Sequence, residues 1–200
     1  KTEEGTRKLY NTRDQLAELN PDFFSVTYGA GGSTRDNTID IVTGMNSKGI
    51  DAAPHLSCVG ESKDNIKQLL QHYADNDIKR IVALRGDLPS GMAASAGELK
   101  YANELVELIK AEHGDRFELE VAAYPEMHPQ ASNFEADLQN FVRKAKAGAN
   151  SAITQYFFNA DAYFRFVDEV RARGVEIPIV PGIMPIVNFG QLCRFSDMCG

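Results

Sequence analysis

The stretch RIVALRGD, residues 80–87, is an apolar run that ends in residues of a different kind. The four residues of 81–84 are apolar without interruption, which is typical of a parallel strand covered on both faces. Arg85, Gly86 and Asp87 then place two opposite charges and a glycine where the strand stops, and a Leu-Pro turn follows. Polar groups at the carboxyl end of a buried strand are typical of sites in proteins built from parallel strands.

Further apolar runs lie on both sides of this stretch, and amphipathic segments separate them. The clearest amphipathic segment is 133–149, where Asn133 or Ser132 could cap a helix and Gly148 could end it. Another helix is expected at about residues 6–19. The helical stripe of the clearest segment consists of Phe134, Leu138, Phe141, Val142 and Ala145, and the other apolar runs are residues 23–29, 51–58, 118–126, 151–158 and 177–185.

This alternation predicts βαβ units and a parallel sheet, which could be a doubly wound sheet or a barrel. The first run is followed by TYGAGGST, residues 27–34, which is rich in glycine but does not match the G-x-G-x-x-G pattern. Polar or aromatic residues instead end almost every run, which favours the barrel. The sequence therefore predicts an α/β protein with one domain over residues 1–200. We expect a (β/α)8 TIM barrel that lacks the first strand and the last strand–helix unit.

Composition excludes several classes of function. The net charge of −7 argues against a nucleic-acid surface, no apolar run approaches the length of a membrane span, and the N-terminus has no signal-peptide character. The three cysteines are interpreted as small, reduced, mostly buried side chains, which favours a cytoplasmic protein. The four histidines never pair at metal spacing, so no metal is expected, and no serine lies in a G-x-S-x-G elbow. What remains suits a large planar cofactor with a phosphate tail.

Seven segments in order carry a resemblance to a known family. They are TYGAGGSTRDNT, AAPHLSC, ALRGDLP, AAYPEMHP, ADLQNFVRKAKAGAN, AITQYFF and VPGIMPIVNFGQ. Together they resemble bacterial methylenetetrahydrofolate reductases. The resemblance implies an FAD-containing TIM barrel that reduces 5,10-methylenetetrahydrofolate to 5-methyltetrahydrofolate with NADH or NADPH, in ping-pong fashion. It also implies a homo-oligomer that acts in one-carbon metabolism and methionine biosynthesis.

The resemblance assigns roles to individual residues. Arg85, Gly86 and Asp87 would hold the flavin, and Asp87 would lie near both flavin and folate, where its charge tunes hydride transfer. Without the resemblance, the polar helix positions after 133 would be interpreted as a solvated face. The other cofactor contacts implied are Thr27, Tyr28, Ala30, His55, Tyr101, Tyr124, His128, Ala131, Asp137, Asn140, Arg143 and Lys144, and the folate contacts implied are Gln155, Gln191 and Phe195.

One departure from the family pattern concerns the general acid. The family has a glutamate on its first strand, which is expected just before Lys1; Glu3 and Glu4 fall at the start of the first helix and are not replacements. We therefore expect these residues to be part of a longer active enzyme. Two alternatives stay open: another FAD barrel, such as a proline dehydrogenase-like enzyme, and a non-catalytic flavin-binding protein.

Overall fold

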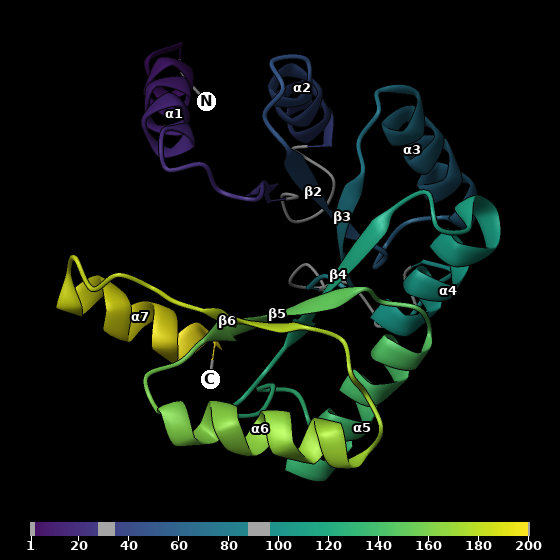
Figure 1. Cartoon of the computed structure of the whole chain (residues 1–200), viewed down its shortest axis with the longest axis vertical. Coiled ribbons are helices and arrows are strands. Elements are labelled where there is room, and N and C mark those ends of the chain that lie inside the picture. Colours follow the sequence, from purple (N-terminus) through teal and green to yellow (C-terminus); the bar gives the residue numbers. More distant parts are fainter. Residues whose placement is uncertain (1–2, 28–34, 88–96, 200) are drawn as a thin grey trace.

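The protein's parallel strands lie side by side in a curved sheet with helices on its outer side (Figure 1). The computed structural model describes residues 3–27, 35–87 and 97–199. Helices and strands alternate along them in the order α1 (Glu3–Ala17), β1 (Phe24–Val26), α2 (Arg35–Asn46), β2 (Ala52–Ser57), α3 (Lys63–Asp75), β3 (Arg80–Leu84), α4 (Ala102–His113), β4 (Glu118–Ala123), α5 (Phe134–Lys146), β5 (Ser151–Tyr156), α6 (Ala160–Ala172), β6 (Ile179–Gly182) and α7 (Phe189–Cys199).

The strand order distinguishes the two architectures that the sequence left open. Within the described residues the sheet has six strands in the order β1-β2-β3-β4-β5-β6, and every neighbouring pair is parallel. A doubly wound sheet reverses its strand order at a switch point, whereas a barrel adds each strand beside the previous one. The arc is therefore a half-barrel with the topology of a (β/α)8 barrel, and the predicted fold class is confirmed.

Each expected apolar run contains one strand, and the helix expected after Ser132 is α5. Asn133 is its N-cap, with its side-chain oxygen accepting a 2.8 Å hydrogen bond from the backbone N–H of Ala136. Phe141 is buried and packs edge-on against Phe166 of α6, with ring centroids 5.1 Å apart. Four of the five stripe residues are buried, and Phe134 is half-buried. Local pattern thus positioned this helix correctly.

The two faces of the sheet carry different side chains. Ile81 and Ala83 of β3 pack with the helices in the hydrophobic core. Successive residues of a strand point to opposite faces, so Arg80 lies on the inner side of the arc. There it pairs with Glu118 and with the buried Glu120, both on β4. This ionic cluster lies at the amino ends of the strands, opposite to the strand ends at which the sequence placed its site.

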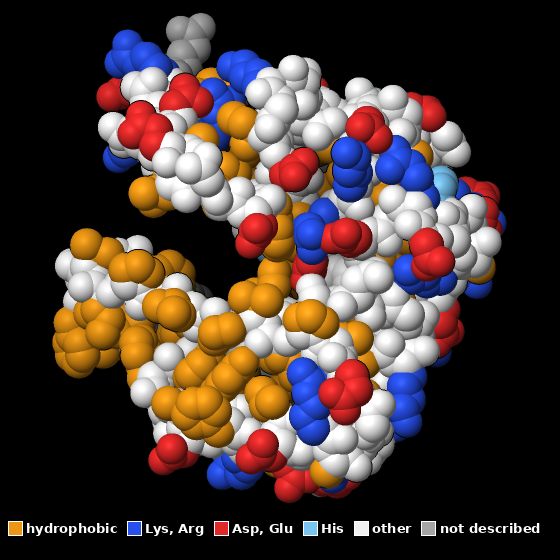
Figure 2. Space-filling model, viewed as in Figure 1, with side chains coloured by type: hydrophobic (Ala, Val, Ile, Leu, Met, Phe, Trp, Pro, Cys, Tyr) orange, Lys and Arg blue, Asp and Glu red, His pale blue; other side chains and the backbone are white. Residues whose placement is uncertain are grey.

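The surface near the last strand is apolar. Hydrophobic side chains gather over β6, α6 and α7 (Figure 2), among them the exposed Ile183, Val187 and Phe189. Cys58 is buried as expected, but Cys193, on α7, is exposed. None of the described helices is both long enough and apolar enough to span a membrane.

Candidate active site

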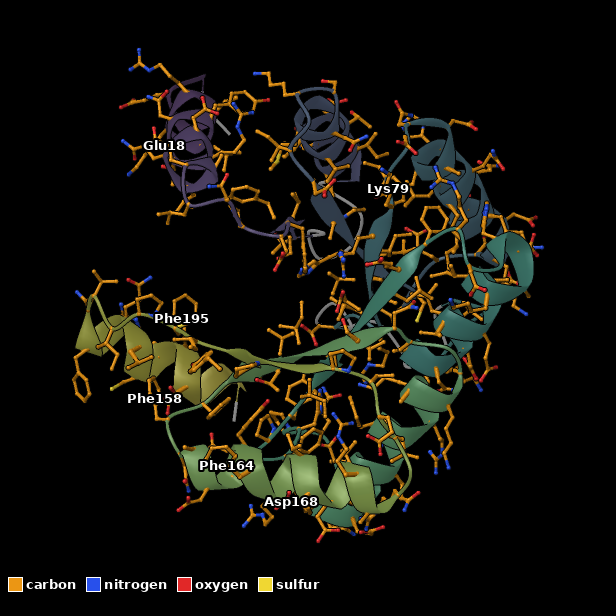
Figure 3. The ribbon with its side chains drawn as sticks, in the orientation of Figure 1. Glu18, Lys79, Phe158, Phe164, Asp168 and Phe195 are labelled. Carbon is orange, nitrogen blue, oxygen red and sulfur yellow. The ribbon has the colours of Figure 1, made fainter. Side chains whose placement is uncertain are left out.

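A cavity of about 200 Å³ lies at the carboxyl ends of β4 and β5, beside α7. The hydroxyl of Tyr156 lies 3.2 Å from Oγ of Ser196, and this contact connects the end of β5 with α7. Figure 3 places Phe195 at α7 and Phe158 between α7 and α6. The lining consists of Tyr124, Pro125, Glu126, Met127, Gln155, Tyr156, Phe158 and Ser196. Two of the residues that the resemblance assigns, one to the flavin and one to folate, therefore share this cavity.

The loop from β4 to α5 is built around His128. The edge of its ring meets Tyr124, with centroids 4.5 Å apart. Its Nδ1 accepts a 3.0 Å hydrogen bond from the backbone N–H of Gln130, and its own backbone N–H donates to Asp137 Oδ2 at 2.8 Å. Met127, just before it, has a φ of +90°, a conformation that side-chain-bearing residues rarely adopt. The loop is thus held in one shape by side chains at some cost in backbone strain.

Arg85 joins the end of β3 to this loop. Its Nε donates to the carbonyl of Gly86 at 3.1 Å, and its Nη2 donates to Oε1 of Gln130 at 2.6 Å. The carbonyl of Arg85 accepts a 2.9 Å hydrogen bond from Oγ of Ser57, at the end of β2. The ends of three neighbouring strands are therefore connected through one residue.

Burial and nearby charges set the pKa values in this region. Burial lowers the pKa of His128, the positive charges of Arg85 and Lys144 lower it further, and the carboxylates of Asp137 and Asp87 oppose the shift. Burial also lowers the pKa of His55. Both imidazoles are therefore held toward the neutral form, in which one ring nitrogen donates and the other accepts.

Lys144 corrects the expectation that the polar residues of α5 form a solvated face. Its ammonium group reaches the carbonyl of Ala122 on β4 and lies over the ring of Phe141, 5.7 Å from the centroid. Burial lowers the pKa of Lys144 to about 8, and the negative charge of Asp137 opposes that shift. Asp137 and Lys144 therefore turn toward the sheet, because the backbone of the loop and of β4 offers each of them a hydrogen-bond partner.

The other two polar residues of α5 that the resemblance assigns to the cofactor face solvent. Asn140 and Arg143 are exposed, and the Oδ1 of the first accepts a 2.7 Å hydrogen bond from Nη1 of the second. The solvated-face interpretation is therefore correct for them, and their role toward a cofactor stays a prediction.

The backbone conformation and the packing around position 86 require a glycine there. Its φ is +87°, and a Cβ built there would lie 1.8 Å from Oγ of Ser57 and 2.9 Å from Cγ1 of Val59. The glycine thus allows the ends of β2 and β3 to pack closely. The close approach of a flavin at this position stays a prediction.

The remaining assigned residues are more scattered. Tyr28 and Ala30 lie outside the described residues. Thr27 is exposed, with its carbonyl accepting from Thr38 Oγ1 at 3.1 Å, and Tyr101 is the exposed N-cap residue of α4. Within residues 3–27, 35–87 and 97–199, no hydrogen bond, ion pair or ring contact joins Asp87, Gln191 or Phe195 to His128, although the charge of Asp87 acts on the pKa of His128. The backbone N–H of Ala131 donates a 2.9 Å hydrogen bond to the His128 carbonyl.

Sequence reasoning missed Gln130, Met127, Tyr156 and Ser196. The first three lie in or beside segments that carried the resemblance. Their place in the sequence therefore pointed to a site, but nothing about their residue types marked them as part of it. Across residues 3–27, 35–87 and 97–199, no group of three or more His, Cys, Asp or Glu side chains could hold a metal ion.

Comparison with solved structures agrees with the fold. An uncharacterised protein from Clostridium thermocellum, described as binding two copies of 5-methyl-5,6,7,8-tetrahydrofolic acid, superposes with a TM-score of 0.64 at 16% identity, over 99% of this chain and 66% of its own. A phosphonopyruvate hydrolase superposes with a TM-score of 0.59 at 12% identity, over 90% of this chain and 68% of its own. At these identities the likeness concerns the fold alone.

Comparison with protein sequences gives the family. The methylenetetrahydrofolate reductase family model matches residues 1–200. The chain is 46% identical to 5,10-methylenetetrahydrofolate reductase of Escherichia coli K12, over 99% of this chain and 66% of the relative, and 38% identical to methylenetetrahydrofolate reductase (NADH) 1 of Zea mays, over 100% and 36%. It thus spans just under two thirds of the length of the bacterial relatives that it matches. With the family model matching along its whole length, the chain belongs to the methylenetetrahydrofolate reductase family.

Proposed function

We propose that this protein takes part in the flavin-dependent reduction of 5,10-methylenetetrahydrofolate to 5-methyltetrahydrofolate, with NADH or NADPH as the reductant. The observation that carries the proposal is the cluster of Arg85, His128 and Lys144 at the strand ends, in which the His128 ring contacts Tyr124 of the cavity wall. The family membership supports the same reaction.

The residues of the cluster fit FAD. A diphosphate needs positive charge and hydrogen-bond donors, and Lys144 offers an ammonium group held inside the protein against a single backbone carbonyl among its described contacts. The isoalloxazine ring needs flat apolar and aromatic surface, and Tyr124 and Tyr156 line the cavity. Burial lowers the pKa of Lys144, and the negative charge of a bound diphosphate would raise it again, as the charge of Asp137 does.

Residues such as Arg85, His128 and Lys144 would hold the flavin, which would supply a two-electron carrier between nicotinamide and folate. The protein's own residues position the reactants. Gln155 lines the cavity and presents an amide that can bind folate or nicotinamide, and Asp87 contributes negative charge near His128. A carboxylate at that place disfavours negative charge on a neighbouring ring and favours a cationic folate.

We also propose that residues 1–200 belong to a single flavin-binding catalytic TIM-barrel domain, of which they are only a part, and that Gln191 and Phe195 of α7 contact the folate. The protein would act in the cytoplasm, as a homo-oligomer, in one-carbon metabolism and methionine biosynthesis. We propose that the other residues that the resemblance assigns to the cofactor also contact FAD: Thr27, Tyr28, Ala30, His55, Tyr101, Ala131, Asn140 and Arg143.

The direct test is anaerobic absorption spectroscopy of the purified protein after addition of FAD and removal of the excess. We expect a retained flavin band that NADH or NADPH bleaches and that 5,10-methylenetetrahydrofolate then restores. Bleaching by proline instead would favour the proline dehydrogenase-like alternative. A retained band that 5,10-methylenetetrahydrofolate does not restore would identify a non-catalytic flavin-binding protein. A protein that retains no flavin would contradict the proposal.

A further inference from the structure

Gln130 occupies a position between two of the proposed cofactor-binding residues. It follows β4 in the loop that leads to α5, and its side chain is exposed. Its Oε1 accepts the 2.6 Å hydrogen bond from Nη2 of Arg85, and its backbone N–H donates the 3.0 Å hydrogen bond to Nδ1 of His128. One residue therefore contacts both the guanidinium and the imidazole, which come from different strand ends.

The contact with Arg85 fixes the direction of a long side chain. With Nε bound to the Gly86 carbonyl and Nη2 bound to Gln130, the planar guanidinium is held at two of its three nitrogens. Nη1 has no hydrogen-bond partner among the residues that the structure describes, and each of its two N–H groups can donate to an anion. A guanidinium held in this way loses less conformational entropy when it binds an anion than a free one would.

The contact with His128 selects a tautomer. Because Nδ1 accepts a hydrogen bond from a backbone N–H, a neutral ring must carry its proton on Nε2. Burial lowers the pKa of this imidazole and so favours the neutral ring. The ring therefore presents an Nε2–H donor, and protonation of Nδ1 would break the hydrogen bond to Gln130.

We propose that Gln130 is a positioning residue, which holds Arg85 and His128 in the orientations in which both donate hydrogen bonds to the bound dinucleotide. The inference rests on the proposed function for the identity of the ligand. Gln130 itself is not among the residues that the resemblance assigns to the cofactor. The side chain acts on Arg85 and the backbone acts on His128, so a side-chain substitution tests the first directly.

The test compares two substitutions with a matched control. Gln130→Met removes the acceptor oxygen but keeps the length of the side chain, Gln130→Glu keeps an acceptor, and Gln71→Met removes an exposed glutamine of α3 that bonds to Asp75. We expect Gln130→Met to weaken FAD binding about tenfold, measured by quenching of flavin fluorescence, and the other two to stay within about threefold of the unmodified protein. Equal affinity of all four proteins, or an equal loss with methionine and glutamate, would overturn the inference.

A second measurement needs no cofactor. The ¹⁵N chemical shifts of the His128 ring distinguish the two tautomers, and we expect the Nε2–H form in the protein without FAD. The side-chain Nε–H signal of Arg85 should exchange with water faster in Gln130→Met than in Gln130→Glu. The opposite tautomer, or equal exchange, would contradict the positioning role even if FAD binds. Failure of the unmodified protein to bind FAD, with these two signals as expected, would instead contradict the proposed function.

Discussion

The carboxylate of Asp137, on the first turn of α5, accepts a 2.8 Å hydrogen bond from the backbone N–H of His128. A helix residue thus holds the loop that precedes its own helix. The negative charge of the same carboxylate also raises the pKa of Lys144 and the pKa of His128, against the effect of burial. One side chain therefore links the shape of the loop to the charge state of the site.

Removing this link should loosen the loop. We expect Asp137→Ala to lower the free energy of unfolding by about 2 kcal/mol, because a charged acceptor of a partly buried N–H is lost. Asp137→Asn, which keeps an acceptor oxygen, should lose less than half of that. Urea unfolding followed by circular dichroism measures both. Asp168→Ala, on the exposed surface of α6 (Figure 3), is the control and should stay within about 0.5 kcal/mol of the unmodified protein. Equal effects of the alanine and asparagine substitutions would contradict the hydrogen bond.

We expect the buried charge of Lys144 to lower the free energy of unfolding and to strengthen FAD binding. At pH 7 the folded protein buries an ammonium group whose pKa is lowered to about 8, so we expect Lys144→Met to raise the free energy of unfolding by about 1 kcal/mol. The same substitution should weaken FAD binding about tenfold, because a cation is lost. Lys146→Met, an exposed position on the same helix, should change neither quantity appreciably.

The sign of the pH dependence provides a further check on Lys144. Between pH 8 and 10.5 the unfolded chain binds more protons at this residue than the folded protein does. The stability of the unmodified protein should therefore rise with pH in this window relative to Lys144→Met. A stability difference that stays constant from pH 7 to pH 10.5 would show that the ammonium group is hydrated in solution.

The two half-buried histidines should make the protein less stable in mild acid. Their folded pKa values lie below the ordinary value of 6.5, so below pH 6.5 the unfolded chain binds more protons at His55 and His128. Their contribution is complete above pH 6.5 and is lost as the pH falls, with a slope of at most about 1.4 kcal/mol per pH unit for each group. Urea unfolding between pH 5 and pH 8 should give a smaller slope for His128→Asn, which keeps an acceptor near Nδ1. The slope of the exposed control His72→Asn measures the background.

Gly86 should not tolerate a side chain. We expect Gly86→Ala to lower the free energy of unfolding by about 2 kcal/mol or more, because alanine is strained at a φ of +87° and its Cβ would overlap Oγ of Ser57. Adding Ser57→Ala should recover only the part due to the overlap. In contrast, Gly44→Ala in α2 meets no atom within 4 Å and should stabilise the protein by about 0.5–1 kcal/mol. A neutral effect of Gly86→Ala would mean that the strand ends move apart easily.

The sequence determined the order of strands and helices and the end of the sheet at which the site lies. Strand and helix periods are local, and so are signals such as the cap at Asn133, so each element could be read from its own residues. Parallel strands bring their carboxyl ends to one edge, and this topology alone placed Arg85 and Tyr124 at the same edge.

Only the tertiary structure decided which polar side chains face that site. On α5 the pattern could not separate Asp137 and Lys144, which turn inward, from Asn140 and Arg143, which stay in solvent. Asp137 and Lys144 turn inward because the loop between β4 and α5 and the strand β4 provide their hydrogen-bond partners. Gln130 was missed for the same reason, because its partner Arg85 is distant in sequence and adjacent only in the folded protein. Side-chain direction is set by the neighbours that folding brings together, and a local pattern contains no information about them.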